Sequence, residues 1–281
     1  MSRSTMNRRE VLARTVAAAG GVALAGATAG VTWPAVRPAA AAAAAMPRIY
    51  TRAEWGARAP DYAAEIINKP DHLVVHHTAS DNVTDYSLDQ AFKLSHWIQD
   101  LHQLTNGWGD TGNQLTISRG GFIMEGRNRT LEAISQRKNV YGVQTANNNS
   151  HTLGIENEGI YVNARPTQWL WDSLTETLAW LCGVYGLDPH QSIVGHRDYV
   201  ATQCPGDVFY SMLPALRDDV AALLARRGAT GATGTRAASR APMPRTAAPA
   251  AGEPAGHTGR LPGPAGPLDH GPAIGRDEPL R

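Results

Sequence analysis

Residues 46–227 of the sequence predict an α/β fold, in which a mixed central β-sheet is flanked by helices within a single domain. Short apolar runs alternate with longer stretches whose apolar residues recur every three to four positions, as strands and helices do. Two of the short runs, 114–118 and 122–125, are separated only by Arg119-Gly120-Gly121, which predicts an antiparallel hairpin. A hairpin within an alternating series predicts a mixed sheet with helices on its faces.

The elements are predicted in chain order. Strands are expected at 72–77, 114–118, 122–125, 152–158 and 192–195, and helices at 87–104, 166–185 and 213–227. Ser87 is the predicted N-cap of the first helix, Pro166 suits the start of the second, and Gly186 suits its end. Residues 126–151 are polar and irregular, and we expect them to form a surface loop bordering a cleft.

The second helix has the clearest core-facing pattern. Its apolar stripe consists of Leu170, Leu174, Leu178, Leu181, Cys182 and Tyr185. Cys182 is one of only two cysteines, and its place on the stripe predicts a small core residue. An exported domain with two cysteines could instead carry one disulfide. The formal net charge of +1 gives no overall attraction to a nucleic acid or to an anionic membrane surface, so neither is an expected partner. We expect the protein to be a monomer.

The two ends of the chain differ in composition from a packed domain. Residues 1–45 resemble a twin-arginine export signal, with Arg8-Arg9 before a weakly apolar run that glycines interrupt. A transmembrane helix needs about 20 strongly apolar residues, so an uncleaved N-terminal anchor is the minor alternative. Residues 228–281 contain no Phe, Trp, Tyr or Lys, which predicts a disordered tail. The protein is therefore expected to be secreted to the cell wall, with no integral membrane segment after processing.

Two distant stretches carry residues that zinc prefers. His196 and Cys204 lie eight residues apart in a loop after the strand at 192–195, and the strand at 72–77 ends in a histidine pair. The end of a strand can place one imidazole of that pair beside the loop, although a histidine there is more often only hydrogen-bonded. Two imidazoles and a thiolate, with the fourth position left to water, are typical of a catalytic Zn²⁺, one per chain.

Seven short motifs, in this order, resemble those of one enzyme family. They are Arg52–Arg58, Val75–Ala79, Gly107–Asp110, Glu125–Arg127, Gly154–Glu156, Gly195–Asp198 and Cys204–Gly206. Together they resemble the zinc-dependent N-acetylmuramoyl-L-alanine amidases of the peptidoglycan recognition protein and phage lysozyme type, the type 2 amidases. The resemblance covers Arg52 to about Leu216.

The resemblance implies a role for several residues. His76, the first of the pair, would bind zinc with His196 and Cys204. Thr202 matches a position where the family carries a Lys or Thr that contacts the substrate or the oxyanion. The chain departs from the family at Asn113, where a catalytic Tyr is expected.

Related bacterial cell-wall-recycling amidases place a catalytic Glu after a Gly-Ile pair. Glu156 matches that Glu, so we interpret it as the general base, the alternative being a buried partner for an Arg. Trp108, Asn113 and His77 are candidates for substrate contacts, and His77 is more readily explained as a structural residue.

The resemblance implies hydrolysis of the amide between N-acetylmuramic acid and L-alanine, with peptidoglycan or muropeptides as substrate. A peptidoglycan-binding recognition module without activity is the alternative. The intact histidines and Cys204 argue against that alternative, and the missing Tyr favours it.

Overall fold

The computed structural model describes residues 45–231, with side chains described up to residue 228. The predicted export signal and almost all of the predicted tail lie outside these residues. None of the helices in the described part of the chain is both long enough and apolar enough to span a membrane.

The described chain alternates strands and helices, as the sequence predicts. The strands are β1 (Ile49–Tyr50), β2 (Ile66–Ile67), β3 (His72–His77), β4 (Leu115–Ile117), β5 (Ile123–Glu125), β6 (Asn139–Val140), β7 (Thr152–Asn157) and β8 (Ile193–Gly195). The helices are α1 (Leu88–Asp100), α2 (Thr130–Ser135), α3 (Gln168–Tyr185), α4 (Pro189–Ser192), α5 (Asp207–Ser211) and α6 (Leu213–Gly231), with a π-helical turn η1 (Leu101–Thr105) and a 3-10 turn η2 (His196–Asp198).

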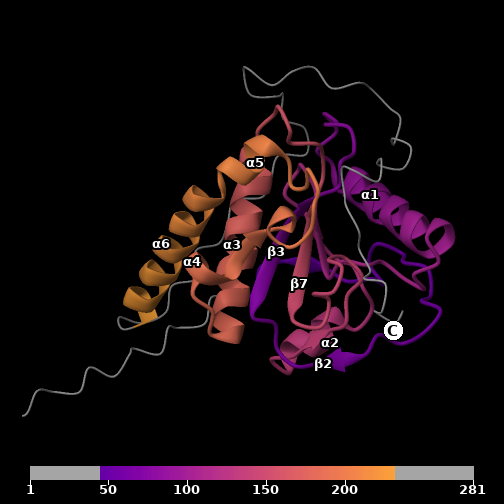
Figure 1. Ribbon diagram of the computed structural model, residues 1–281, viewed down its shortest axis with the longest axis horizontal. Helices are drawn as coiled ribbons and strands as arrows, with labels where there is room; N and C mark the ends of the chain where they lie inside the picture. Colours follow the sequence, from indigo (N-terminus) through magenta and orange to yellow (C-terminus); the bar gives the residue numbers. More distant parts are fainter. Residues whose placement is uncertain (1–44, 232–281) are drawn as a thin grey trace, which may run out of the picture. The chain divides into compact units, whose positions relative to one another are not determined.

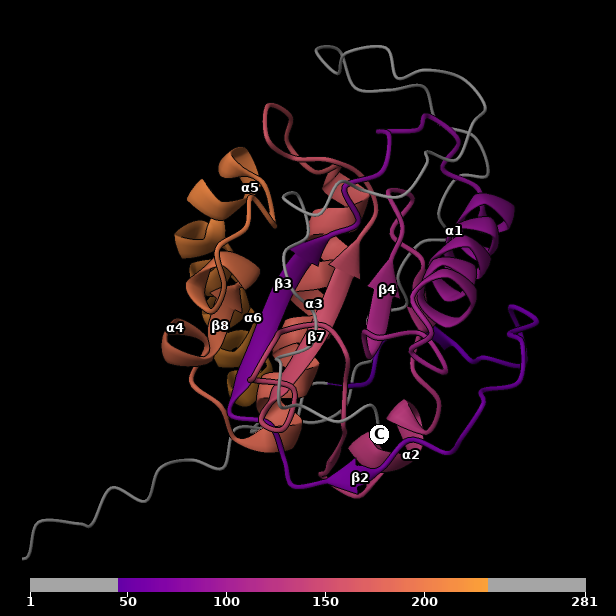
Figure 2. The same cartoon turned by 45° about the vertical axis from the view of Figure 1, so that its right-hand side comes forward.

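Among the described residues, six strands form one sheet in the order β1-β5-β4-β7-β3-β8. Strands β4, β7 and β3 and the edge strand β8 are parallel, whereas β4 and β5 form the predicted antiparallel hairpin. Figure 2 shows β3, β7 and β4 side by side. The mixed sheet flanked by helices is therefore confirmed.

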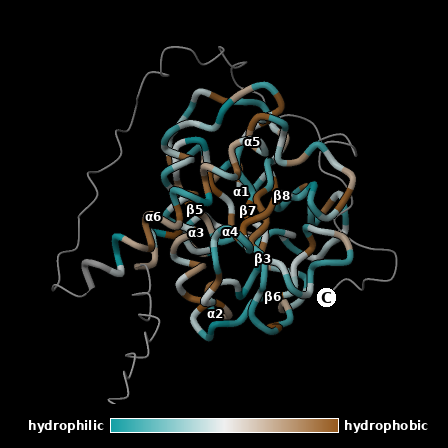
Figure 3. Tube along the Cα trace, turned by 60° about the vertical axis from the view of Figure 1, so that its left-hand side comes forward, coloured by the Kyte–Doolittle hydropathy of each residue, from teal (hydrophilic) through white to brown (hydrophobic). Residues whose placement is uncertain are grey.

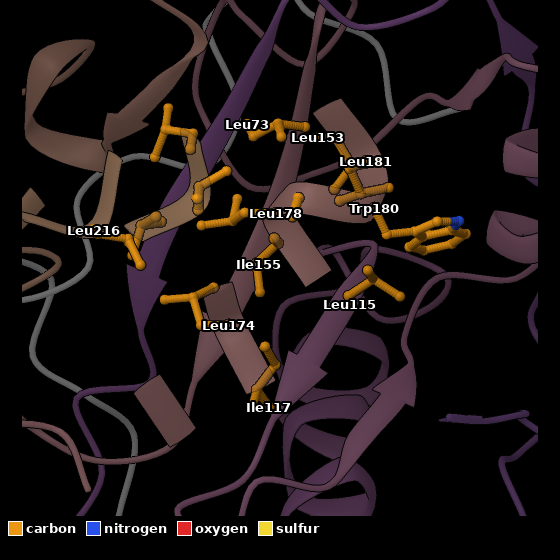
Figure 4. Close-up of a cluster of buried hydrophobic side chains, with 14 of the residues drawn as sticks. Leu73, Leu115, Ile117, Leu153, Ile155, Leu174, Leu178, Trp180, Leu181 and Leu216 are labelled. Atoms are coloured by element: carbon orange, nitrogen blue, oxygen red, sulfur yellow. The ribbon is translucent and has the colours of Figure 1, made fainter. Parts of the chain in front are cut away.

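One face of the sheet carries the main hydrophobic core. Side chains alternate between the two faces of a strand, so every second residue of β3, β4 and β7 points toward α3 and α6. The core residues labelled in Figure 4 include Leu73, Leu115, Ile117, Leu153, Ile155, Leu174, Leu178, Leu181 and Leu216. Figure 3 shows hydrophobic residues concentrated where β3, β7 and β8 run through the domain. Each fully buried Leu or Ile stabilises the fold by about 1.5–3 kcal/mol.

The opposite face of the sheet is covered by α1 (Figure 1) and by the segment that carries Gln144, which packs against Gly154 of β7. Met124 of β5 packs there against Trp55 and Ala91, and this cluster is small. The residues of β4 and β7 that share this face include Thr116 and Glu156, which pair in register. This second face is polar, and it is where the chemistry-bearing side chains lie.

The apolar stripe of α3 and its end at Gly186 agree with the prediction, whereas the helix begins at Gln168 and not at Pro166. Thr167 accepts a hydrogen bond from the Leu170 N–H at the start, and Gly186 ends the helix with a positive φ of 68°. All six residues of the predicted stripe are buried, including Cys182, which is a free thiol. The last helix, α6, runs to Gly231 and so extends beyond the predicted end at Arg227.

The expectation of an irregular surface loop at 126–151 is wrong. This segment contains α2 and β6, and residues 139–146 are all buried. The polar side chains that are buried here bond to one another and to the backbone: Asn149 Oδ1, for example, accepts from the Gln144 and Thr145 N–H groups.

Candidate metal centre

His76, His196 and Cys204 come together on the polar face of the sheet. Each is fully buried, and their potential ligand atoms all lie within 4.8 Å of one another. The two imidazole ring centroids are 4.4 Å apart, and Cys204 Sγ lies 3.7 Å from His76 Nδ1.

The strand register explains this convergence. Val75 of β3 pairs with Gly195 of β8, so the next residues, His76 and His196, emerge side by side at the carboxyl ends of parallel strands. The loop that follows folds back, with the Arg197 N–H donating to the Cys204 carbonyl at 3.1 Å. The His77 N–H donates to Cys204 Sγ at 3.4 Å, which holds the sulfur beside β3. The carboxyl ends of strands are the usual location of ligand sites in open α/β sheets.

One distance within this group is close to that of a tetrahedral zinc site. With Zn–S near 2.3 Å and Zn–N near 2.0–2.1 Å, a tetrahedral site separates S and N by about 3.5 Å. The observed separation of Cys204 Sγ and His76 Nδ1 is 3.7 Å. Burial, and then the Glu156 charge, raise the pKa of the Cys204 thiol well above its usual value, so a cation beside the sulfur is what would favour thiolate here.

Glu156 lies next to this group on β7. It pairs in register with His76 on one side and with Thr116 on the other, so all three share the polar face. Its side chain is only 2% exposed, and Oε1 lies 3.9 Å from His76 Nδ1. The carboxylate is thus close to the His76 nitrogen that faces Cys204. It is not part of the group of three, whose potential ligand atoms all lie within 4.8 Å of one another.

Thr202 lies in the loop between His196 and Cys204 and is half-buried. Its hydroxyl accepts a hydrogen bond from the Cys204 N–H at 3.0 Å. The side chain therefore belongs to the turn that presents the sulfur.

The placement of His77 gives no support to a substrate contact. As the neighbour of His76 on a strand, His77 points to the opposite face. It is fully buried there, and its Nδ1 accepts from the Tyr161 N–H at 3.3 Å. His77 is therefore part of the packing on the α3 side.

Asn113 and Trp108, the other two candidates for substrate contacts, differ in burial. Asn113 is fully buried, and its Nδ2 donates to the Leu115 carbonyl at 2.8 Å and to Thr116 Oγ1 at 3.0 Å. Trp108 is half-buried, and its ring packs against His102 at a centroid distance of 4.6 Å. Of the two, only Trp108 keeps a surface that a ligand could reach.

A buried carboxylate at Asp110 anchors the glycine-rich loop. It forms an ion pair with Arg52 at 3.0 Å and accepts from Gln99 Nε2 at 3.0 Å. The backbone N–H and Nδ2 of Asn128 both donate to its other oxygen at 2.8 Å. These bonds tie Asp110 into the structure that surrounds the loop.

Gln144 is a member of the site that the sequence analysis missed. It is 2% exposed, and its Oε1 lies 2.7 Å from His76 Nε2. The signal in the sequence was Gly154, because a glycine inside a strand often marks a close approach of another group.

A second group of potential ligands, Asp71, His72 and His151, lies at the amino ends of β3 and β7. Both Nδ1 atoms are 2.7 Å from the same oxygen of Asp71, whose side chain is 62% exposed. This distance is that of a hydrogen bond, so the geometry is that of two imidazoles donating to one surface carboxylate.

Glu158 is a further buried carboxylate, just beyond the end of β7. Its oxygens accept from Gln90 Nε2 at 2.9 Å and from the Arg119 N–H at 2.7 Å. Burial raises the pKa of Glu158 to about 7, because removal from water disfavours the charged form more than these bonds favour it.

The raised pKa of Glu158 predicts a loss of stability with rising pH. The native state holds this proton more tightly than the unfolded state does, so the stabilisation is complete below pH 4.5 and is lost as the pH passes about 7. We expect the free energy of unfolding of Glu158→Gln, relative to wild type, to rise by about 2–3 kcal/mol from pH 5 to pH 8 in urea unfolding of the metal-free proteins. A difference that does not change with pH would contradict this.

Comparisons with known proteins point to one family. The family model described as N-acetylmuramoyl-L-alanine amidase matches residues 67–207, half of the chain. The chain is 32% identical over 172 residues to an N-acetylmuramoyl-L-alanine amidase of Homo sapiens, a match that covers 59% of this chain and 28% of that protein. It is 30% identical over 164 residues to peptidoglycan-recognition protein LB of Drosophila melanogaster, covering 58% of this chain and 66% of that protein. The chain thus spans less than two thirds of either relative.

Solved structures show the same architecture. Drosophila PGRP-LB matches with a TM-score of 0.52 and 28% sequence identity, over 60% of this chain and 93% of that chain. A variant of PGRP-LB in complex with tracheal cytotoxin matches with a TM-score of 0.53 and 28% identity, over 60% and 94% of the two chains. The residues that the family model matches include His76, Glu156, His196 and Cys204. The chain therefore belongs to the N-acetylmuramoyl-L-alanine amidase family.

Proposed function

We propose that this protein is a zinc-dependent amidase that hydrolyses the bond between N-acetylmuramic acid and L-alanine in peptidoglycan. The observation that carries this proposal is the buried convergence of His76, His196 and Cys204 beside the carboxylate of Glu156. Membership of the amidase family, with relatives named amidase and peptidoglycan-recognition protein, supports the substrate class.

The ligand set would hold one Zn²⁺ through two imidazoles and a thiolate. When bound, the ion would supply a Lewis acid for the scissile carbonyl and lower the pKa of a water toward ~7. Glu156 would accept a proton from the attacking water and later deliver it to the departing nitrogen of L-alanine. Its burial and its place beside His76 suit a base that acts close to the metal.

Two other features complete the proposal. Thr202 lies in the turn that carries Cys204, and its hydroxyl would donate a hydrogen bond to the developing oxyanion. A donor at the oxyanion lowers the barrier because the negative charge develops there in the transition state.

The paired arginines and the weakly apolar run near the amino terminus support export by a twin-arginine route to the cell wall, where the substrate is found.

A muropeptide digestion tests the proposed function. The zinc-loaded protein is expected to release stem peptides with a free amino group on L-alanine, as identified by mass spectrometry. A chelator should abolish release, and added zinc should restore it. A zinc-loaded protein that binds muropeptides but leaves the amide intact would contradict this function and favour a recognition module.

A further inference from the structure

His76 uses its two ring nitrogens for different partners. Nε2 lies 2.7 Å from Gln144 Oε1, and both side chains are buried. Nδ1 faces the other way, toward Cys204 Sγ at 3.7 Å and Glu156 Oε1 at 3.9 Å. A neutral imidazole carries its hydrogen on one nitrogen only, so whatever fixes that hydrogen also decides which nitrogen can bind a metal.

The neighbours of Gln144 determine which end of its amide faces His76. Gln144 Nε2 donates to Thr152 Oγ1 at 2.7 Å, and the hydroxyl of Thr152 donates to the Asn148 carbonyl at 2.7 Å. Because that hydroxyl has already used its hydrogen, it must accept from the amide nitrogen. The amide oxygen is then the atom beside His76, and it also accepts from the Thr145 hydroxyl.

An amide oxygen accepts hydrogen bonds and donates none, so the contact at 2.7 Å requires a hydrogen on His76 Nε2. The lone pair of the ring is then on Nδ1, directed toward Cys204. The chain of bonds from Asn148 through Thr152 and Gln144 therefore sets the tautomer of His76.

Gly154 shows that the fold makes room for this amide. A Cβ at this position would lie 2.7 Å from both Cδ and Oε1 of Gln144. Glycine weakens the interior of a strand, yet it stands in the middle of β7 between Thr152 and Glu156. The absence of a side chain at residue 154 lets Gln144 approach β7 closely while its Oε1 contacts His76.

We propose that Gln144 is a positioning residue, which holds His76 in the Nε2–H tautomer and so directs its Nδ1 lone pair to the metal. The proposal rests on the zinc site of the proposed function. A partner of this kind orients a metal-binding imidazole, and its loss typically weakens metal affinity 10–100-fold. A neutral amide performs this task without adding another negative charge beside Glu156 and the Cys204 thiolate.

Two substitutions separate the hydrogen bond from packing. Gln144→Leu keeps a side chain of similar size but removes the hydrogen-bond acceptor. Its zinc affinity is expected to fall about 10–100-fold, as measured by chelator competition. Gln144→Glu keeps an acceptor and should retain affinity within a few-fold of wild type. Thr145→Val removes the other bond to the same oxygen and serves as the matched control, with little expected change.

A Gln144→Leu protein that binds zinc as tightly as wild type, with an unchanged absorption spectrum after Co²⁺ substitution, would overturn this inference but leave the proposed function intact. A wild-type protein that binds no zinc would overturn both. If the Leu variant does not fold, long-range ¹H–¹⁵N correlation spectra of the zinc-loaded wild type decide the matter: a hydrogen on His76 Nε2 is expected, and one on Nδ1 would refute the inference.

Discussion

Glu156→Gln is expected to lower kcat by roughly 10²–10⁴ while the zinc content stays near that of wild type. The amide of Gln has nearly the shape of the carboxylate but cannot accept the proton of the attacking water. Glu156 is the carboxylate beside His76 Nδ1, at 3.9 Å, and it contributes no atom to the converging group of three. Steady-state hydrolysis of a defined muropeptide, together with metal analysis of the same sample, measures both quantities.

Glu158→Gln is the matched control for this experiment. It removes a buried carboxylate two residues further along, which bonds to Gln90 and to the Arg119 N–H instead of facing the metal centre. Its kcat should stay within a few-fold of wild type. Hydrolysis by zinc-loaded Glu156→Gln at close to the wild-type rate would show that the base lies elsewhere.

Cys204→Ser is expected to lose most of its zinc and, with it, most of its activity. A hydroxyl is a far poorer zinc ligand than a thiolate at neutral pH, and the two remaining imidazoles do not make a three-ligand site. The variant should purify from zinc-containing medium with well below one zinc per chain, as measured by atomic emission.

Cys182→Ser provides the comparison, because it alters the other buried free thiol of the chain. Cys182 lies in α3, on the hydrophobic side of the sheet, and its replacement should leave the zinc content unchanged. A Cys204→Ser protein with stoichiometric zinc and full activity would refute the ligand assignment.

Elements with a regular apolar period could be predicted from the sequence. The leucines of α3 and its end at Gly186 lie as expected, because burial of one apolar stripe and a glycine C-cap decide where such a helix runs. The strand that carries His76 was also predicted. Because side chains alternate along a strand, His77 points away from His76, and its ring lies near that of Tyr161.

The segment 126–151 could not be predicted in the same way. Its residues are polar, and polarity alone suggests exposure. In the fold, Gln144, Thr145 and Asn149 are buried because each bonds to partners that are specific to the folded state. The hydropathy of a residue carries no information about such partners. Gln144, which contacts His76, is therefore expected at the surface from its polarity alone.

The separation in sequence of the three converging side chains has a consequence for assembly. His76 precedes Cys204 by 128 residues, and β8, which leads to His196 and Cys204, is an edge strand that pairs with β3 alone among the described strands. An ion shared by these side chains would close a long loop and fasten the margin of the sheet, much as a disulfide would. During synthesis from the amino terminus, the centre could not form until residue 204 had left the ribosome. The ion could therefore bind only late in synthesis or afterwards, and an export route that carries folded chains would allow it to bind before export.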